Sequence, residues 1–129
     1  MEINKSLLDN LLEQAAASPR LRMNLDLRTT EADGSQRMLN ALLPETVLPI
    51  HRHTKTTETL VLLRGRMEEI FYEEGCETSR VLLEAGGEVQ GLCIPVGQWH
   101  TVNVLEPTVI LECKDGKYEP LSQEDMISL

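Results

Sequence analysis

The stretch HRHTKTTETLVLLRG, residues 51–65, carries two histidines two positions apart, a glutamate five positions after the second, and a glycine at its end. The chain contains 3 histidines in all, so most of them lie in this one segment. Successive side chains of a strand point to opposite faces, so we expect His51 and His53 on one face and Arg52 on the other. Glu58 then opens an apolar run and can place its carboxylate beside the two imidazoles.

The third histidine lies in PVGQWHTVN, residues 95–103, where Pro95 and Gly97 predict a turn just before a strand-like run. All histidines therefore sit at strand starts next to turns, as at the mouth of a barrel. Three imidazoles and one carboxylate suit Fe, Mn, Ni, Co, Zn or Cu, and four ligands leave positions open on an octahedral ion. The alternative is that each histidine is a surface or strand-capping residue. We predict one divalent transition-metal ion, bound by His51, His53, Glu58 and His100.

Outside these two segments, the sequence predicts one mainly β domain. Ser6-Leu7-Leu8-Asp9 has the form of a capping box, and leucines recur at helical spacing behind it, which predicts an N-terminal helix over residues 6–18. From about residue 24 to 115, short runs rich in Val, Leu and Ile alternate with Gly, Pro and Asp turns, which indicates an antiparallel sandwich or barrel. No repeat or linker divides the chain, so we predict a single domain over residues 1–129.

Composition limits the classes of function. Aromatic residues make up 3% of the chain and 21 acidic residues face 12 basic ones, which disfavours a nucleic-acid partner. The N-terminus lacks the pattern of a signal peptide, and no run of about 18 apolar residues could cross a membrane. Cys76, Cys93 and Cys113 show no CxxC spacing and are expected to be reduced thiols. We expect a cytoplasmic protein that binds a small molecule and neither nucleic acid nor membrane.

The two histidine segments resemble the two cupin motifs. His51, His53, Glu58 and Gly65 match the HxH, Glu and Gly places of the first motif, and PVGQWH matches the PxGxxH core of the second. Glu45 and Val89 stand where each motif begins with Gly, and Asn103 falls one residue early. The resemblance implies a cupin barrel, a double-stranded β-helix or jelly roll, behind an N-terminal α-helix, with a metal ion on the four ligands.

A narrower resemblance covers nearly the whole chain. The segments AAASPRLRMNLDL, QRMLNALLPET, IHRHTKTTETLVLLRGRM and GKYEP, in this order, are similar to the WbuC family of small cupin metalloproteins. The resemblance implies a sugar-related role, because WbuC proteins are often associated with bacterial polysaccharide gene clusters. No established reaction comes with the family.

Several further residues are candidates for substrate binding. Arg20, Arg22, Arg28 and Arg37 could together hold a phosphate or carboxylate, or could simply pair with some of the acidic residues. An amide among apolar neighbours and two groups that could act as acid or base complete the set: Asn40, Tyr72 and Glu112. A structural hydrogen bond for the amide and edge exposure for the other two are the alternatives.

Two functions of different classes fit these features. The first is a metal-dependent enzyme that acts on a sugar derivative or a small organic acid held at the open positions of the ion. The second is a metal-containing module that binds a saccharide or acid without transforming it. A purely structural metal is the weaker reading, since the aliphatic core suffices for folding. Homodimerisation is expected, because the edge strands of such a barrel are usually covered.

Overall fold

The computed structural model describes residues 1–127, which begin with helix α1 (Lys5–Ala17). The helix begins one residue earlier than the sequence predicts because Asn4, not Ser6, is the N-cap: its Oδ1 accepts a hydrogen bond from the Leu7 amide at 3.0 Å. Asn is among the best N-cap residues, which explains why the helix begins at Lys5. The helix buries one face through Leu8, Leu11 and Ala15.

The rest of the described chain is mainly strand, and the predicted mainly β fold class is confirmed. The strands are β1 (Arg22–Asp26), β2 (Gln36–Leu42), β3 (Ile50–His51), β4 (Glu58–Glu73), β5 (Cys76–Glu84), β6 (Gly91–Ile94), β7 (Trp99–Lys114) and β8 (Met126–Ile127). A 3-10 helix, η1 (Gln123–Asp125), precedes the last of them. Every pairing between these strands is antiparallel.

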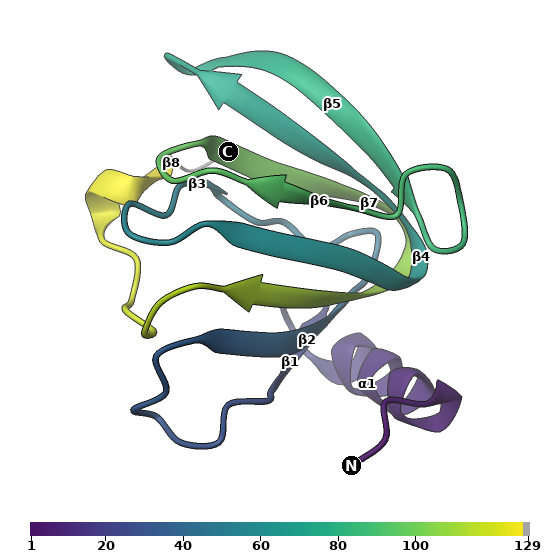
Figure 1. Ribbon diagram of the computed structural model, residues 1–129. Helices are drawn as coiled ribbons and strands as arrows, with labels where there is room; N and C mark the ends of the chain where they lie inside the picture. Colours follow the sequence, from purple (N-terminus) through teal and green to yellow (C-terminus); the bar gives the residue numbers. More distant parts are fainter. Residues whose placement is uncertain (128–129) are drawn as a thin grey trace.

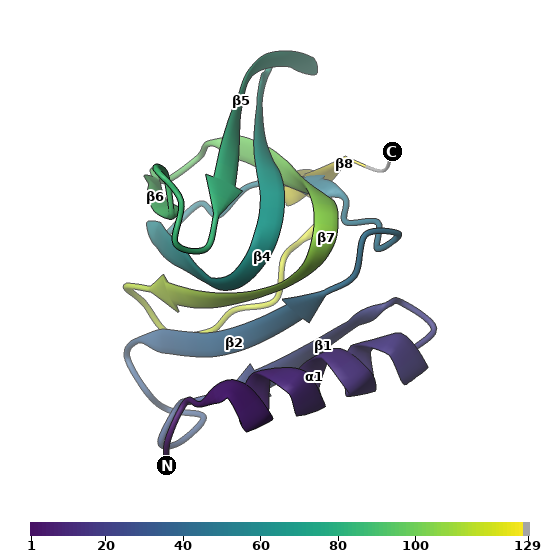
Figure 2. The ribbon, with the colours of Figure 1, turned by 90° about the vertical axis from the view of Figure 1, so that its right-hand side faces the viewer.

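Two long strands, β4 and β7, build both walls of the barrel. They pair with each other along nearly their whole length, from Glu58 opposite Lys114 to Tyr72 opposite Trp99. The first half of β4 also pairs with β6, and its second half pairs with β5. Figure 2 shows both strands curving around the barrel, with β2 joined to the lower part of β7.

The bend in these strands is centred on Gly65. Its φ is +93°, and the pairing with β7 shifts register on both sides of it. A Cβ at this position would lie 2.4 Å from the carbonyl oxygen of Pro107 and 2.4 Å from Oγ1 of Thr108. Only glycine allows both the left-handed conformation and the close approach of the two chains. This is the structural reason for the glycine that ends the 51–65 stretch.

Alternation along the strands separates two apolar cores. Leu42, Leu60, Leu62, Met67, Leu83, Ile94, Val104 and Ile110 fill the barrel. A second core lies outside it, where α1 covers β1 and β2 and packs Leu8, Leu11 and Ala15 against Leu39, Ala41 and Val109 (Figures 1 and 2). The helix therefore covers the outer face of one wall of the barrel and does not enter the barrel interior.

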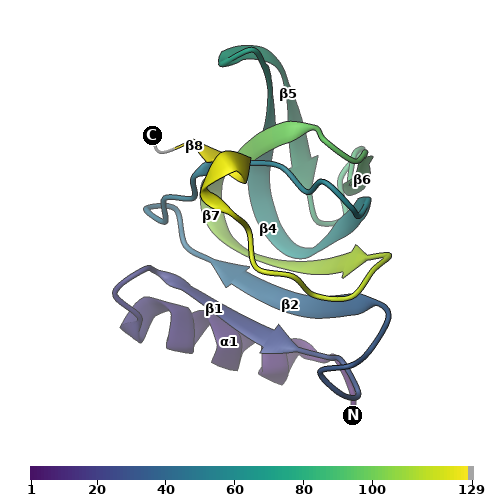
Figure 3. The ribbon, with the colours of Figure 1, turned by 90° about the vertical axis from the view of Figure 1, so that its left-hand side faces the viewer.

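The sheet reaches beyond the expected residues 24–115 at both ends. β1 begins at Arg22, and the two-residue strand β8 pairs Ile127 with Ile50 of β3. A strand this short leaves no alternation to detect in a sequence. Figure 3 shows the segment after β7 returning to η1 and β8 beside β3. In residues 1–127, no helix combines the length and the apolar character needed to cross a membrane.

Candidate metal centre

The three histidines come from the neighbouring strands β3 and β7 and from the loop that follows β3. His51 on β3 is the direct cross-strand partner of His100 on β7. His53 lies beyond the end of β3, so strand alternation alone does not place it. Its carbonyl instead accepts a hydrogen bond from the Gly97 amide at 2.8 Å, which ties the first histidine segment to the turn of the second.

The three rings face a common centre. Ring centroids are 4.3 Å apart for His51 and His100 and 5.2 Å apart for His51 and His53. One ligand nitrogen from each of the three rings can be chosen so that all lie within 4.8 Å of one another. Zn–N bonds are about 2.0–2.1 Å long, so nitrogens around one ion must lie within roughly 4 Å of each other. Small side-chain movements therefore suffice to bring the rings to one ion.

Glu58 lies at the same centre, as the first residue of β4. Its Oε1 is 3.2 Å from Nε2 of His53 and 3.9 Å from Nε2 of His100. The carboxylate is buried, at 5% exposure, and it faces the interior beside the rings. A buried carboxylate next to imidazole nitrogens completes a mixed nitrogen and oxygen donor set suited to first-row transition metals.

Backbone carbonyls orient two of the rings. Nδ1 of His51 lies 3.0 Å from the carbonyl oxygen of Pro49, and Nδ1 of His100 lies 2.9 Å from that of Gln98. A carbonyl only accepts, so each Nδ1 carries the proton and each Nε2 keeps its lone pair. Nε2 of His53 and of His100 are buried, and although Glu58 Oε1 lies 3.2 and 3.9 Å from them, neither makes a hydrogen bond of normal geometry to the described residues. Such unsatisfied nitrogens are what a metal ion would coordinate, so the residues fit the metal that the sequence predicts.

Burial and neighbouring charges shift the pKa values of His51, His100 and Glu58. Burial, and then the nearby His100 ring, lower the pKa of His51 to about 4, and burial lowers the pKa of His100. Burial works against the charge of Glu58, but the His53 ring and the Lys114 ammonium outweigh it and lower its pKa to about 2. At neutral pH the site therefore offers the neutral imidazoles of His51 and His100 and the ionised carboxylate of Glu58, the forms that bind metal.

The centre opens into a cavity of about 530 Å³ inside the barrel. Its walls carry the four candidate ligands, aliphatic side chains of the inner core, and further polar groups from β2, β4 and β7. Residues 117–122, on the segment that follows β7, line its rim. A volume of this size is within the range of small-molecule sites.

Two of the predicted substrate-binding residues line this cavity. Asn40 on β2 donates from Nδ2 to Oε1 of Glu112 on β7, at 3.2 Å. Lys114 lies on the other side of Glu112, with Nζ 3.5 Å from Oε2. Burial, and then the charge of Glu58, raise the pKa of Glu112.

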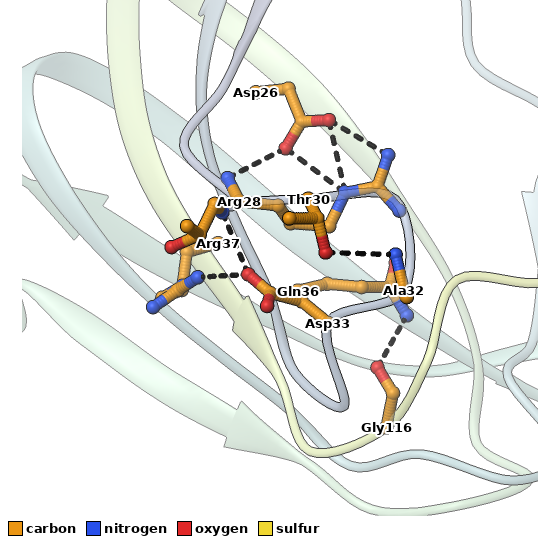
Figure 4. Close-up of polar contacts among 9 residues, drawn as sticks. Asp26, Arg28, Thr30, Ala32, Asp33, Gln36, Arg37 and Gly116 are labelled. Carbon is orange, nitrogen blue, oxygen red and sulfur yellow. Dashed lines mark hydrogen bonds and ion pairs between the residues drawn. The ribbon is translucent and has the colours of Figure 1, made fainter.

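The remaining candidates lie away from the cavity lining. Arg22 donates to the carbonyl of Val47, and Tyr72 pairs in the sheet with Trp99. Figure 4 shows the β1–β2 loop, where Arg37 contacts Asp33 at 2.7 Å and Arg28 contacts Asp26 at 2.8 Å. Arg20 is exposed before β1, and its carbonyl accepts a hydrogen bond from Thr46. The structure thus does not bring these arginines together around one anion site.

Glu69 is the cavity residue that sequence reasoning missed. It lies on the second half of β4, is 1% exposed, and its Oε2 makes no hydrogen bond within the described residues. Burial, and then the charges of Glu58 and Glu112, raise its pKa well above the usual value. A signal for it exists in RMEEIFY, because Met67, Glu69 and Phe71 alternate onto the inward face.

The cysteines stay outside the site. All three cysteines are free thiols, and Cys76 and Cys93 are exposed. This agrees with the expectation from their spacing that they are reduced thiols and not metal ligands. Trp99 also lies outside the cavity lining: the Arg52 guanidinium lies 4.6 Å from its ring centroid, in a cation–π contact.

Solved structures with the cupin fold resemble this chain. The capsular polysaccharide assembling protein CapF from Staphylococcus aureus superposes with a TM-score of 0.69 at 20% identity, over 87% of this chain and 32% of CapF. Oxalate oxidase in complex with the substrate analogue glycolate gives 0.65 at 15% identity, over 81% of this chain and 55% of the oxidase. Oxalate decarboxylase from Lactobacillus farciminis, in a formate complex, gives 0.62 at 18% identity, over 84% of this chain and 30% of the decarboxylase.

At these identities the likeness concerns the fold, and the chain has the cupin jelly-roll fold that its two histidine motifs predicted. The chain spans about half of the length of the oxidase and about a third of the length of the other two proteins. A comparison with curated protein sequences finds no match.

One sequence family does match. Residues 3–83, more than half of the chain, match the model of a family described as Domain of unknown function (DUF6016). The matched range includes His51, His53, Glu58 and Glu69, and it ends before His100. The chain belongs to the DUF6016 family.

Proposed function

We propose that the protein is a metal-dependent cupin enzyme that acts on a small oxygen-rich ligand, a sugar derivative or an organic acid. One divalent transition-metal ion would be bound by His51, His53, His100 and Glu58. The observation that carries this proposal is the convergence of the three rings, with two buried Nε2 atoms that the described protein leaves without a hydrogen bond.

When bound, a divalent ion supplies Lewis acidity to a carbonyl or hydroxyl oxygen of the ligand. The protein's own groups do the remaining work. The Pro49 and Gln98 carbonyls hold two rings in the tautomer that keeps Nε2 unprotonated. Residues 117–122 and the aliphatic inner core line the cavity around the ligand position.

Glu69 and Glu112 favour an enzyme over a passive site. Both carboxyls line the cavity, and burial raises the pKa of each, which favours the protonated form relative to an exposed glutamate. Perturbed carboxyls in a cleft are typical of groups that transfer protons. Glu112 also contacts the Lys114 ammonium at 3.5 Å, which favours its ionised form and opposes the effect of burial on its pKa.

A role in polysaccharide metabolism rests on resemblance. The segments similar to WbuC run from the end of α1 to the GKYEP segment, residues 116–120, most of which lies on the cavity rim. Among the proteins of similar fold, CapF is described as a capsular polysaccharide assembling protein. A homodimer that covers the sheet edges remains part of the proposal.

Metal titration tests the proposal. Protein stripped with a chelator is titrated with Mn²⁺, Fe²⁺, Co²⁺, Ni²⁺, Cu²⁺ and Zn²⁺, and bound metal is measured by elemental analysis. We expect one ion per chain in the wild type and a loss of at least about tenfold in affinity for His51→Ala and His100→Ala. Glu112→Gln, a change in a cavity carboxyl that lies outside the ligand set, serves as the matched control and should keep the ion.

Equal affinity in His100→Ala and the wild type would remove the metal from this centre. The metal that binds most tightly then directs activity assays, because redox-active iron and inert zinc support different reaction classes.

The alternative is a binding module that recognises a saccharide or acid without transforming it. The cavity lined by the four candidate ligands is consistent with such a module as well. The two functions differ in what is recovered after incubation with metal-loaded protein. Unchanged ligand that still shifts the metal spectrum supports the module, whereas product that depends on Glu69 or Glu112 supports the enzyme.

A further inference from the structure

The cavity wall beyond the metal centre leaves two buried acceptor atoms unused. Oε2 of Glu69 and Oδ1 of Asn40 are both buried and make no hydrogen bond to the described residues. The orientation of the Asn40 amide is fixed by its bond from Nδ2 to Glu112, so the free atom is the oxygen. Leaving a buried polar atom without a partner is costly, so such atoms point to a partner that enters from outside the chain.

The charges around the cavity disfavour an anionic partner. Its lining contains the carboxylates Glu58, Glu69, Glu112, Glu119 and Asp125 and the lysines Lys55, Lys114 and Lys117, and within the described residues no arginine. Two of the lysines already contact carboxylates, Lys55 with Glu119 at 2.9 Å and Lys114 with Glu112 at 3.5 Å. A dicarboxylate needs several cationic or bidentate partners. Among the described lining residues, Lys117 is the one lysine without a carboxylate contact.

The apolar part of the same wall is smooth and aliphatic. Leu42, Leu60, Val102 and Ile110 line the cavity between the polar groups. Aliphatic side chains pack against C–H surfaces, whereas charged or strongly hydrated groups would lose solvation there. The wall thus alternates between apolar surface and single hydrogen-bonding atoms.

We propose that Asn40 and Glu69 form a subsite for an uncharged, hydroxyl-rich ligand, whose hydroxyl groups bind Oδ1 of Asn40 and Oε2 of Glu69 while its other end reaches the histidine cluster. A hydroxyl both donates and accepts, as water does, so it can replace water at both atoms without loss of hydrogen bonds. The inference rests on the proposed function for the metal end of the ligand. Of the two ligand classes in the proposed function, the inference favours the sugar derivative over the organic acid.

The state of Glu69 fits this assignment. Burial and the neighbouring carboxylates raise its pKa, so the carboxyl is favoured in its neutral form. A neutral carboxyl offers one donor and one acceptor, which again matches a hydroxyl and avoids a buried charge.

A matched ligand panel tests the subsite. D-glucose, D-galactose and D-mannose are each compared with the corresponding uronate, which has the same ring but replaces the terminal CH₂OH by a carboxylate. Binding to metal-loaded protein, and to the metal-free protein in parallel, is measured by calorimetry. We expect at least one hexose to bind, and to bind more tightly than its uronate.

Two substitutions locate the contacts. Glu69→Met and Asn40→Leu keep side-chain volume while removing the hydrogen-bonding atoms, and we expect each to weaken hexose binding by about tenfold or more. Glu69→Gln keeps a donor and an acceptor, so it should retain most of the affinity. Metal content and the unfolding midpoint verify that each variant is folded.

Three results would overturn the subsite: a uronate that binds more tightly than its hexose, no hexose bound at millimolar concentration, or unchanged affinity in Glu69→Met and Asn40→Leu. Each can occur while the wild type still binds one ion, which would leave the proposed metal centre standing. If instead no metal binds and the metal-free protein shows the expected hexose preference, the metal proposal fails and the subsite stands.

Discussion

Replacing Gly65 by alanine should strongly destabilise the barrel. The residue has a φ of +93°, which costs a residue with a Cβ roughly 1–2 kcal/mol. The added Cβ would also lie 2.4 Å from the Pro107 carbonyl oxygen and 2.7 Å from Cα of Thr108. Backbone atoms cannot rotate away, so the two strands must separate, at a further cost of about 1–3 kcal/mol. We expect Gly65→Ala to lower the free energy of unfolding by about 2–5 kcal/mol, out of a total of about 5–15 kcal/mol.

Gly75 provides the matched control. It has a φ of +78° in the β4–β5 turn, but a Cβ there would meet nothing within 4 Å. Gly75→Ala therefore measures the conformational cost alone, about 1–2 kcal/mol. Urea unfolding followed by far-ultraviolet circular dichroism gives both values from midpoints and slopes. If the two variants lose the same stability, the close approach between Gly65 and the Pro107–Thr108 backbone does not constrain the fold, and the reasoning is refuted.

Three further predictions follow from burial and charge. Because burial lowers the pKa of His51 to about 4 and lowers that of His100, the protein should hold its metal at pH 6 and release it only as the pH falls toward about 4–5, as measured by elemental analysis after dialysis. Leu11→Ala should lower the free energy of unfolding by about 2–4 kcal/mol, because it leaves a cavity between α1 and the sheet, while the metal content stays unchanged. The folded pKa of Glu69 is raised, so the folded state binds more protons than the unfolded state above the ordinary glutamate pKa, and wild-type stability should fall as the pH rises through that range. Glu69→Gln should remove this loss, so the variant gains stability relative to the wild type as the pH rises above the ordinary glutamate pKa, measured by urea unfolding at a series of pH values. An equal pH slope in both proteins would contradict it.

The candidate metal ligands could be predicted because each lies in a short sequence motif with a characteristic spacing. The HxH spacing, the glutamate and the glycine follow each other within one short stretch, and PVGQWH has its own turn residues. What brings the two segments together is the pairing of His51 with His100, a contact between positions far apart in the chain. No local pattern encodes that pairing, and only the resemblance to the two cupin motifs supplied it.

Features that depend on register or on depth were harder to predict. The interior position of Glu69 follows from alternation with Met67 and Phe71, but Glu68 beside it has the same side chain and faces outward. Choosing between the two glutamates requires knowing which parity points inward, and the bulge near Gly65 changes that parity along β4. The arginines near β1 were clustered in sequence, yet two of them pair with nearby aspartates, Arg28 with Asp26 and Arg37 with Asp33.

The order of inward residues on β4 and β7 explains why the site lies at one end of the barrel. Reading outward from Gly65 in either direction, the inward side chains of β4 pass from aliphatic, Leu62 and Met67, to acidic, Glu58 and Glu69. β7 follows the same rule on both sides of its own bend, from Val104 to His100 and from Ile110 to Glu112 and beyond. The bend is therefore the closed, apolar end, and the four strand halves present their polar residues together at the open end. Buried carboxylates that cost stability stand only where a ligand or an ion can reach them, which is the distribution expected of a binding site and not of a core.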